Sequence, residues 1–214
     1  MSEAEVVVAQ PNSMLSMTSG LHLTASVGRR GTKSSAGWFG GMKSVLGGEN
    51  VFTAEFRAKR DGQTLMLAPD SQGDILPISL SGKGGYNLTR GAYLADIGEC
   101  ELTIKYGGVK GMMAKTGLFL LHAVGEGTVF CQTYGAIVEQ ELAEGENFIV
   151  DNRFVVAFSD TVQYQLVKAT KSLKDSMLSG EGLVVKYTGP GTVFYQTRGK
   201  PAVGWLSTFL GAAF

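Results

Sequence analysis

The sequence predicts an all-β fold, because short apolar or alternating runs of strand length follow one another along the chain. A second observation is a recurring stretch: three lysine-containing segments each precede a strand and then a further glycine. The three later glycines, Gly62, Gly127 and Gly191, lie 65 and 64 residues apart. A fixed period of this kind indicates one supersecondary unit used three times.

The expected strands are recognised by alternation and by their β-branched and aromatic residues. Residues 21–26 and 51–58 alternate apolar with polar or small side chains, which is typical of strands with one buried face. Glycine or Asp-Gly separates the runs, as turns with positive φ require. Further strands are expected at residues 75–80, 118–122, 137–142, 154–158 and 162–167.

The period divides one domain, residues 1–214, into three pseudo-repeats at about 42–106, 107–168, and 169–214 plus 1–27. The third unit is short, because the sequence ends 23 residues after Gly191. We therefore expect the N-terminal strands to complete it beside the C-terminal ones. Such closure hides edge strands, which otherwise invite aggregation, and predicts a closed barrel-like structure or β-prism.

The charge and hydropathy of the chain bear on its partners and its location. The formal net charge is zero and only 18% of residues are charged, below the roughly 25% of typical globular domains. This balance favours neither nucleic acid nor an anionic membrane as a partner. No apolar stretch reaches the ~18 residues of a membrane span, and residues 1–8 lack a signal-peptide pattern. We expect a cytoplasmic protein, with peripheral membrane association left open.

The sequence predicts no catalytic, cofactor or metal site. His22 and His122 are the only histidines, and each lies in a strand-like run without a neighbouring pair of metal ligands. Residues 28–34 (Gly-Arg-Arg-Gly-Thr-Lys-Ser) do not have the spacing of a phosphate-binding loop. Cys100 and Cys131 occupy non-equivalent positions and are expected to be reduced and buried. We therefore expect a protein that is not an enzyme and needs no cofactor.

The most apolar segment is the end of the sequence, residues 203–214, which carries no charge. It is too short to span a bilayer. Three interpretations stay open: packing in its own core, docking at a subunit interface, or contact with a membrane. The candidate interface residues are Trp205, Leu206, Phe209, Leu210 and Phe214.

A second candidate group comes from the recurring stretch, which contributes one lysine in each unit. Three-fold repetition of the unit would gather these side chains round one axis. The alternative is that each lysine covers a connector with its aliphatic stem. The residues of this candidate three-fold cluster are Lys43, Lys110 and Lys174.

Several glycine-containing motifs, taken together, resemble a known family. They are residues 48–52 (Gly-Glu-Asn-Val-Phe), 91–95 (Gly-Ala-Tyr-Leu-Ala), 151–158 (Asp-Asn-Arg-Phe-Val-Val-Ala-Phe), and 180–183 (Gly-Glu-Gly-Leu) leading to 189–197 (Gly-Pro-Gly-Thr-Val-Phe-Tyr-Gln-Thr). With these motifs nearly the whole chain resembles the altered inheritance of mitochondria protein 24 family. The resemblance implies a fold related to the tryptophan RNA-binding attenuation protein, a shortened double-stranded β-helix that assembles into rings.

The resemblance implies self-association, as a trimer or larger, and brings no catalytic residues. RNA binding does not transfer with a fold, and the neutral charge opposes it. We therefore expect a non-enzymatic structural or interaction protein that associates with itself, with another protein partner left open. The alternative is a ligand- or RNA-binding ring, by analogy with the fold relative.

Overall fold

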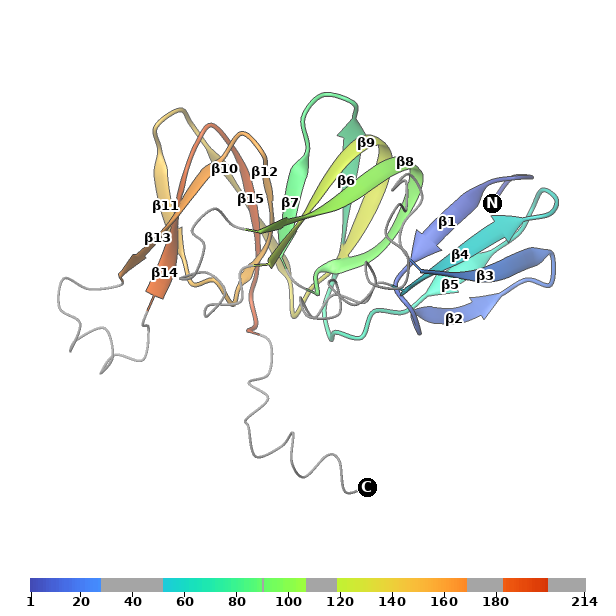
Figure 1. Cartoon of the computed structure of the whole chain (residues 1–214). Coiled ribbons are helices and arrows are strands. Elements are labelled where there is room, and N and C mark those ends of the chain that lie inside the picture. The colour runs from blue at the N-terminus through green and yellow to red at the C-terminus, as the bar shows by residue number, and fades with distance from the viewer. Residues whose placement is uncertain (28–51, 90, 107–118, 169–182, 200–214) are drawn as a thin grey trace, which may run out of the picture.

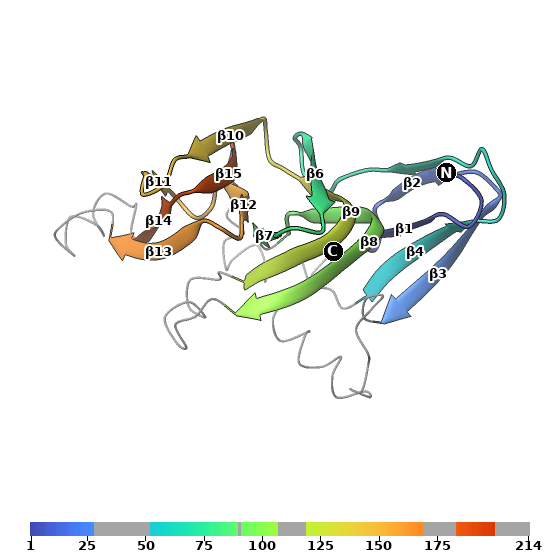
Figure 2. The same ribbon diagram turned by 90° about the horizontal axis from the view of Figure 1, so that it is seen from above.

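The structure, a computed structural model, describes residues 1–27, 52–89, 91–106, 119–168 and 183–199. All regular elements in these ranges are strands, which confirms the predicted all-β class. The strands form three groups in a row: β1–β5 at one end, β6–β9 in the middle and β10–β15 at the other end (Figure 1). The view from above shows the same row (Figure 2).

The first group is built around β4, which pairs with β1 along one edge and β3 along the other. A separate pair, β2 with β5, completes the group. All of these pairings are antiparallel. The strands are β1 (Val6–Ala9), β2 (Met14–Met17), β3 (Leu21–Val27), β4 (Phe52–Ala58) and β5 (Leu65–Leu67).

The middle group is built around one long strand, β9. It pairs with β8 along one edge and with both β6 and β7 along the other. The strands are β6 (Ile75–Ser81), β7 (Tyr86–Thr89), β8 (Tyr93–Tyr106) and β9 (Phe119–Gln132).

The third group has two central strands in place of one. β15 lies between β10 and β12, and β14 lies between β11 and β13. The strands are β10 (Ile137–Leu142), β11 (Asn147–Val150), β12 (Val155–Ser159), β13 (Gln163–Lys168), β14 (Leu183–Thr188) and β15 (Gly191–Gln196).

Two strand pairings join the groups into one ten-stranded sheet. β1 of the first group pairs with β8, and β7 of the middle group pairs with β12. We call these pairings the first seam and the second seam. The path of strands through this sheet begins at β10 and ends at β3.

The predicted closure is wrong for the residues that the structure describes. The sheet does not return on itself, and the N-terminal strands do not complete the third group. Instead β3 pairs with β4, and β1 pairs with β4 and β8. The physical reason is that β4 presents two edges close to the N-terminal strands in the chain, whereas both edges of β15 are already paired with β10 and β12.

The periodic glycines have different structural roles. Gly62 has a φ of 73° and lies between β4 and β5, as a turn requires. Gly127 is instead inside β9, opposite Gly98 of β8. A side chain on Gly127 would meet the backbone oxygen of Ile97, so glycine here allows two strands to approach closely. Gly191 is the first residue of β15.

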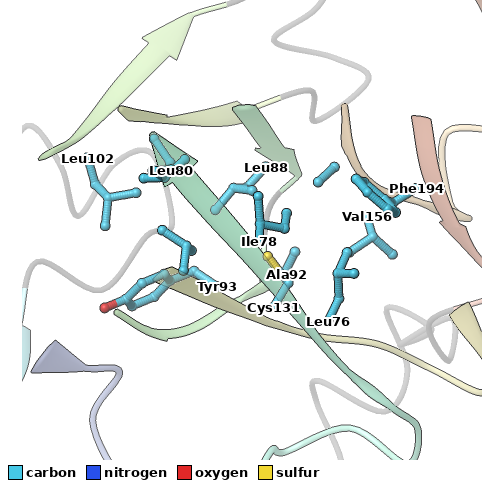
Figure 3. Close-up of a cluster of buried hydrophobic side chains, with 13 residues drawn as sticks. Leu76, Ile78, Leu80, Leu88, Ala92, Tyr93, Leu102, Cys131, Val156 and Phe194 are labelled. Carbon is cyan, nitrogen blue, oxygen red and sulfur yellow. The ribbon is translucent and has the colours of Figure 1, made fainter. Parts of the chain in front are cut away.

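The central core shows how alternation produces the packing. In β6 the side chains of Leu76, Ile78 and Leu80 are buried while those between them are exposed. They pack with residues of β7, β8 and β9, and with Val156 and Phe194 of the third group (Figure 3). Fully burying an aliphatic or aromatic side chain of this size contributes about 1.5–3 kcal/mol. The core therefore holds the middle and third groups together.

Two buried glutamines fix the connections between groups. Gln132 Oε1 accepts a hydrogen bond from the Asp70 N–H, and Gln196 Oε1 accepts one from the Tyr134 N–H, at 2.9 and 2.8 Å. The Gln196 amide also donates to the Arg153 carbonyl at 3.1 Å. The two glutamines lie at the ends of β9 and β15, so each strand holds the segment that leads from the preceding group.

Replacing Gln196 by alanine should destabilise the fold. Gln196→Ala removes both hydrogen bonds of a buried side chain, which leaves one N–H and one carbonyl group without this partner. We expect the free energy of unfolding to fall by about 2–3 kcal/mol, measured by urea denaturation. Gln140→Ala is the control, because the Gln140 amide donates only to the exposed Glu141 carbonyl. An equal loss in both variants would contradict this role of Gln196.

Candidate interaction surfaces

Large apolar side chains are exposed where β2 pairs with β5, at one end of the row of groups. All four residues of β2 are exposed, and Leu15 retains 62% of its accessible surface. Met66 of β5, which lies opposite Ser16, retains 50%. We call Met14, Leu15, Met17 and Met66 the β2–β5 patch. Met14 and Met17 pair with Leu67 and Leu65, whereas Met66 pairs with Ser16, so alternation places Met66 on the other face of this strand pair.

Local structure keeps these side chains outside. Leu65 and Leu67 of β5 pack against the buried cluster that contains Val7 and Phe56, so alternation turns Met66 to the surface. The start of β2 is fixed by Ser13, whose carbonyl accepts a hydrogen bond from the Ala68 N–H at 2.7 Å. The patch therefore belongs to the folded arrangement of β2 and β5.

The other end of the row also exposes an apolar residue. Ile149 of β11 retains 59% of its surface, while Val150 beside it is buried. Phe148 is partly buried, and its ring lies 5.6 Å from that of Tyr195. The side chains on either side of Ile149 thus anchor β11 to the third group and leave Ile149 outside.

Side-chain hydrogen bonds reinforce both seams. At the first seam the Tyr93 hydroxyl is 3.0 Å from the Val8 carbonyl oxygen and 2.6 Å from Asp96 Oδ2. At the second seam the Thr89 hydroxyl donates to the Val155 carbonyl at 2.8 Å. Because buried polar groups are costly unless they are hydrogen-bonded, these contacts allow polar residues to lie within a largely apolar sheet.

A histidine and an aspartate face each other beside the second seam. His122 lies on β9 opposite Asn87 of β7, and Asp160 follows the end of β12. His122 Nε2 and Asp160 Oδ2 are 3.6 Å apart, which is too long for a hydrogen bond. The Asp160 N–H donates to the Gly85 carbonyl at 2.9 Å, so the backbone fixes the position of the aspartate.

The environment of His122 favours its neutral form. Burial lowers the pKa of His122 below its ordinary value of 6.5, and the positive charge of Lys105 lowers it further. Asp160 acts in the opposite direction without cancelling these effects. In the described residues, no group of three or more His, Cys, Asp or Glu side chains could hold a metal ion.

The interaction residues predicted from the sequence lie outside the part that the structure describes. This holds for the candidate interface residues Trp205, Leu206, Phe209, Leu210 and Phe214, and for Lys43, Lys110 and Lys174. The ranges that contain the lysines, 28–51, 107–118 and 169–182, each follow one strand of a pair and precede the other. The pairs are β3 with β4, β8 with β9, and β13 with β14.

Sequence reasoning did not identify the β2–β5 patch. The sequence predicts that the N-terminal strands complete a closed third unit, and residues 14–17 lie among those strands. No local signal marks these residues, because β1 also has adjacent apolar residues and is buried at all four positions.

Within the described ranges, no helix is long and apolar enough to cross a membrane.

Comparison with known proteins identifies a family and a fold. A family model described as Mitochondrial biogenesis AIM24 matches residues 1–198. The crystal structure of protein SPYM3_0169 from Streptococcus pyogenes is similar to this one, with a TM-score of 0.72 and 26% sequence identity. The match covers 99% of this chain and 89% of that one. No curated protein matches the sequence.

Stability should decrease as the pH falls through the range in which His122 titrates. The pKa of His122 is lower in the folded chain than in the unfolded chain, so the unfolded chain binds more protons between those two values. Stability therefore rises with pH across this window and is lost as the pH falls below about 6.5. One proton changes the free energy of unfolding by at most about 1.4 kcal/mol per pH unit.

The two histidines provide a matched test of this dependence. His122→Gln should show a shallower loss of stability between pH 7.5 and 5, measured by urea unfolding at each pH. His22→Gln, at an exposed position of β3, is the matched control for the loss of a histidine side chain. An unchanged slope in His122→Gln would show that other groups cause the dependence.

Proposed function

Since the chain belongs to the Mitochondrial biogenesis AIM24 family, whose biochemical function is unknown, we propose that it is a structural or interaction protein whose main partner is a second copy of itself. We propose that it is not an enzyme. Its cytoplasmic location stays a prediction. The observation that supports self-association most directly is the β2–β5 patch, four large apolar side chains exposed on two paired strands at one end of the molecule.

The free energy gained by burying the patch is too small to hold two copies together by itself. Fully burying one side chain of this size contributes about 1.5–3 kcal/mol, so four that are already half-buried contribute about 3–6 kcal/mol. Association itself costs about 4–15 kcal/mol in lost translational and rotational freedom. Stable association therefore needs further contacts beyond the patch, and backbone pairing between strands is the kind that an exposed strand provides.

The charge distribution favours a protein partner over RNA. Glu99 and Glu126 lie opposite each other on β8 and β9, and Glu101 follows two residues after Glu99. All three are exposed. Such a group of negative charges repels phosphate, whereas nucleic-acid surfaces need clustered lysine and arginine.

Charged residues in the patch should weaken self-association. The double variant Leu15→Lys with Met17→Lys changes only exposed positions, so the protomer should stay folded. Burying two lysines in an interface should raise the dissociation constant at least about 100-fold, which corresponds to about 2.7 kcal/mol. Sedimentation velocity across a concentration series measures this change.

The matched control is Gln163→Lys with Gln165→Lys, which places two lysines at the same spacing on exposed positions of β13. This control should associate like the unmodified chain. Equal dissociation in both variants would indicate general charge repulsion. An unmodified chain that stays monomeric at every concentration would show that self-association is wrong.

A further inference from the structure

The two seams inside the chain have the same geometry. In each, three residues of a short strand pair antiparallel with three residues that begin two positions after the first residue of a receiving strand. The receiving residues, 95–97 in β8 and 157–159 in β12, are 62 positions apart. The pairs are Ala9–Ala95, Val8–Asp96 and Val7–Ile97 at the first seam, and Leu88–Ala157, Asn87–Phe158 and Tyr86–Ser159 at the second.

β2 has the features of the two receiving strands. In all three strands the register shifts by one residue at the same place, and each pairs there with a later strand of its own group. Ser16 and Met17 of β2 therefore correspond to the first two receiving residues, and Thr18 follows them. The shifts lie between Met14 and Ser16, between Tyr93 and Ala95, and between Val155 and Ala157.

β2 differs from β8 and β12 in the exposure of the middle receiving residue. Asp96 is 5% exposed and Phe158 is fully buried, and each pairs with a strand from the preceding group, while the Phe158 ring also packs in the core of the third group. Met17, at the corresponding position, is 39% exposed. Among the described residues β2 pairs with β5 alone, so its outer edge is open.

β11 has the features of the two short donor strands. β1, β7 and β11 each have four residues, and each pairs with the strand that follows a long connection. The middle donor residues of β1 and β7, Val8 and Asn87, are 9% and 7% exposed. Ile149 of β11 corresponds to them and is 59% exposed. Their inner partners are Glu55, His122 and Lys186.

Each chain thus presents one open receiving strand and one open donor strand. Within the described residues β11 pairs with β14 alone. β2 and β11 lie at opposite ends of the row of groups, so the two edges of one copy are far apart (Figure 1). In the part of the chain that the structure describes, two receiving strands, β8 and β12, are paired with a donor strand of the same chain, whereas β2 is not. The open edge of β2 in one copy can therefore accept the open donor strand β11 of another copy.

We propose that β11 of one copy pairs antiparallel with β2 of the next, in the register of the internal seams. This places Ile149 opposite Met17, Val150 opposite Ser16, and Phe148 opposite Thr18. The inference rests on the proposed self-association and names its contact surface. The interface is heterologous, because different strands of the two copies meet, so copies join head to tail and form a closed ring or a filament.

The proposed register places the exposed side chains of Ile149 and Met17 opposite each other. Ile149 and Met17 are both apolar and both outside in the single chain, and the register makes them direct neighbours across the new pair. The backbone hydrogen bonds of this pair supply the additional contacts that the β2–β5 patch requires. Met14 and Met66 then lie next to the joined strands.

Disulfide formation between copies tests the register. The variant Ile149→Cys with Met17→Cys places two thiols at directly opposite positions, where the Cα separation of about 4.5–5.5 Å allows a disulfide. Mild oxidation should give a ladder of covalent oligomers on a non-reducing gel, with the 17–149 linkage identified by peptide mass spectrometry. Two single variants, Ile149→Cys and Met17→Cys, co-expressed on differently tagged chains, should give covalent mixed dimers and no larger covalent oligomers.

Two controls accompany the cysteine pair. The unmodified chain retains Cys100 and Cys131, and burial raises the pKa of Cys131 to about 12, so its thiol should contribute little. Ile149→Cys with Met66→Cys places the second thiol one strand further away, about 4.8 Å beyond β2. This pair should not link.

The possible outcomes distinguish failure of the proposed register from failure of the proposed self-association. Linkage through positions 17 and 149 supports the proposal. Linkage through 66 and 149, linkage of Met17→Cys to itself, or no linkage in a chain that sedimentation shows to be oligomeric would each overturn the register while self-association stands. A chain that is monomeric by sedimentation and forms no linkage would overturn both.

Discussion

Backbone N–H and C=O groups of a strand need partners on both edges, and this requirement organises the molecule. β9 meets it most fully, because it pairs with β8 on one edge and with β6 and β7 on the other. The pairing of β7 then reaches β12, and that of β8 reaches β1, so the sheet extends from the middle group in both directions. In the described residues this sheet ends at β10 and β3, while the exposed apolar residues of β2, β5 and β11 belong to the two smaller sheets beside it.

The two seams share a backbone register but differ in side chains. The first seam includes a buried aspartate hydrogen-bonded to Tyr93, whereas the second has Phe158 at the same position. Beside the second seam lies His122, and the corresponding residue beside the first is Glu55, which forms an ion pair with Arg57. Backbone pairing thus sets the geometry, and side chains give each seam its own dependence on pH and polarity.

The candidate site was only partly accessible from the sequence. The recurring segments predicted a cluster of three lysines, and hydropathy predicted an interface within residues 203–214. All of these residues lie outside the described part of the chain. The exposed residues Met17 and Ile149 lie in ordinary apolar runs, and nothing local distinguishes them from the buried Val8 or Phe158. Their exposure depends on whether another strand covers them, and that is a property of pairing between distant segments.

The sequence by itself determined the all-β class, because strand-length alternation follows from the two-residue period of side chains along a strand. It also determined where several strands lie, as for β6 and β10, and its glycine-containing motifs identified the family. Only the tertiary structure decided which strands are neighbours. Strands with similar alternation compete for the same edges, and the choice of β4 for both β1 and β3 left the sheet open between its two ends.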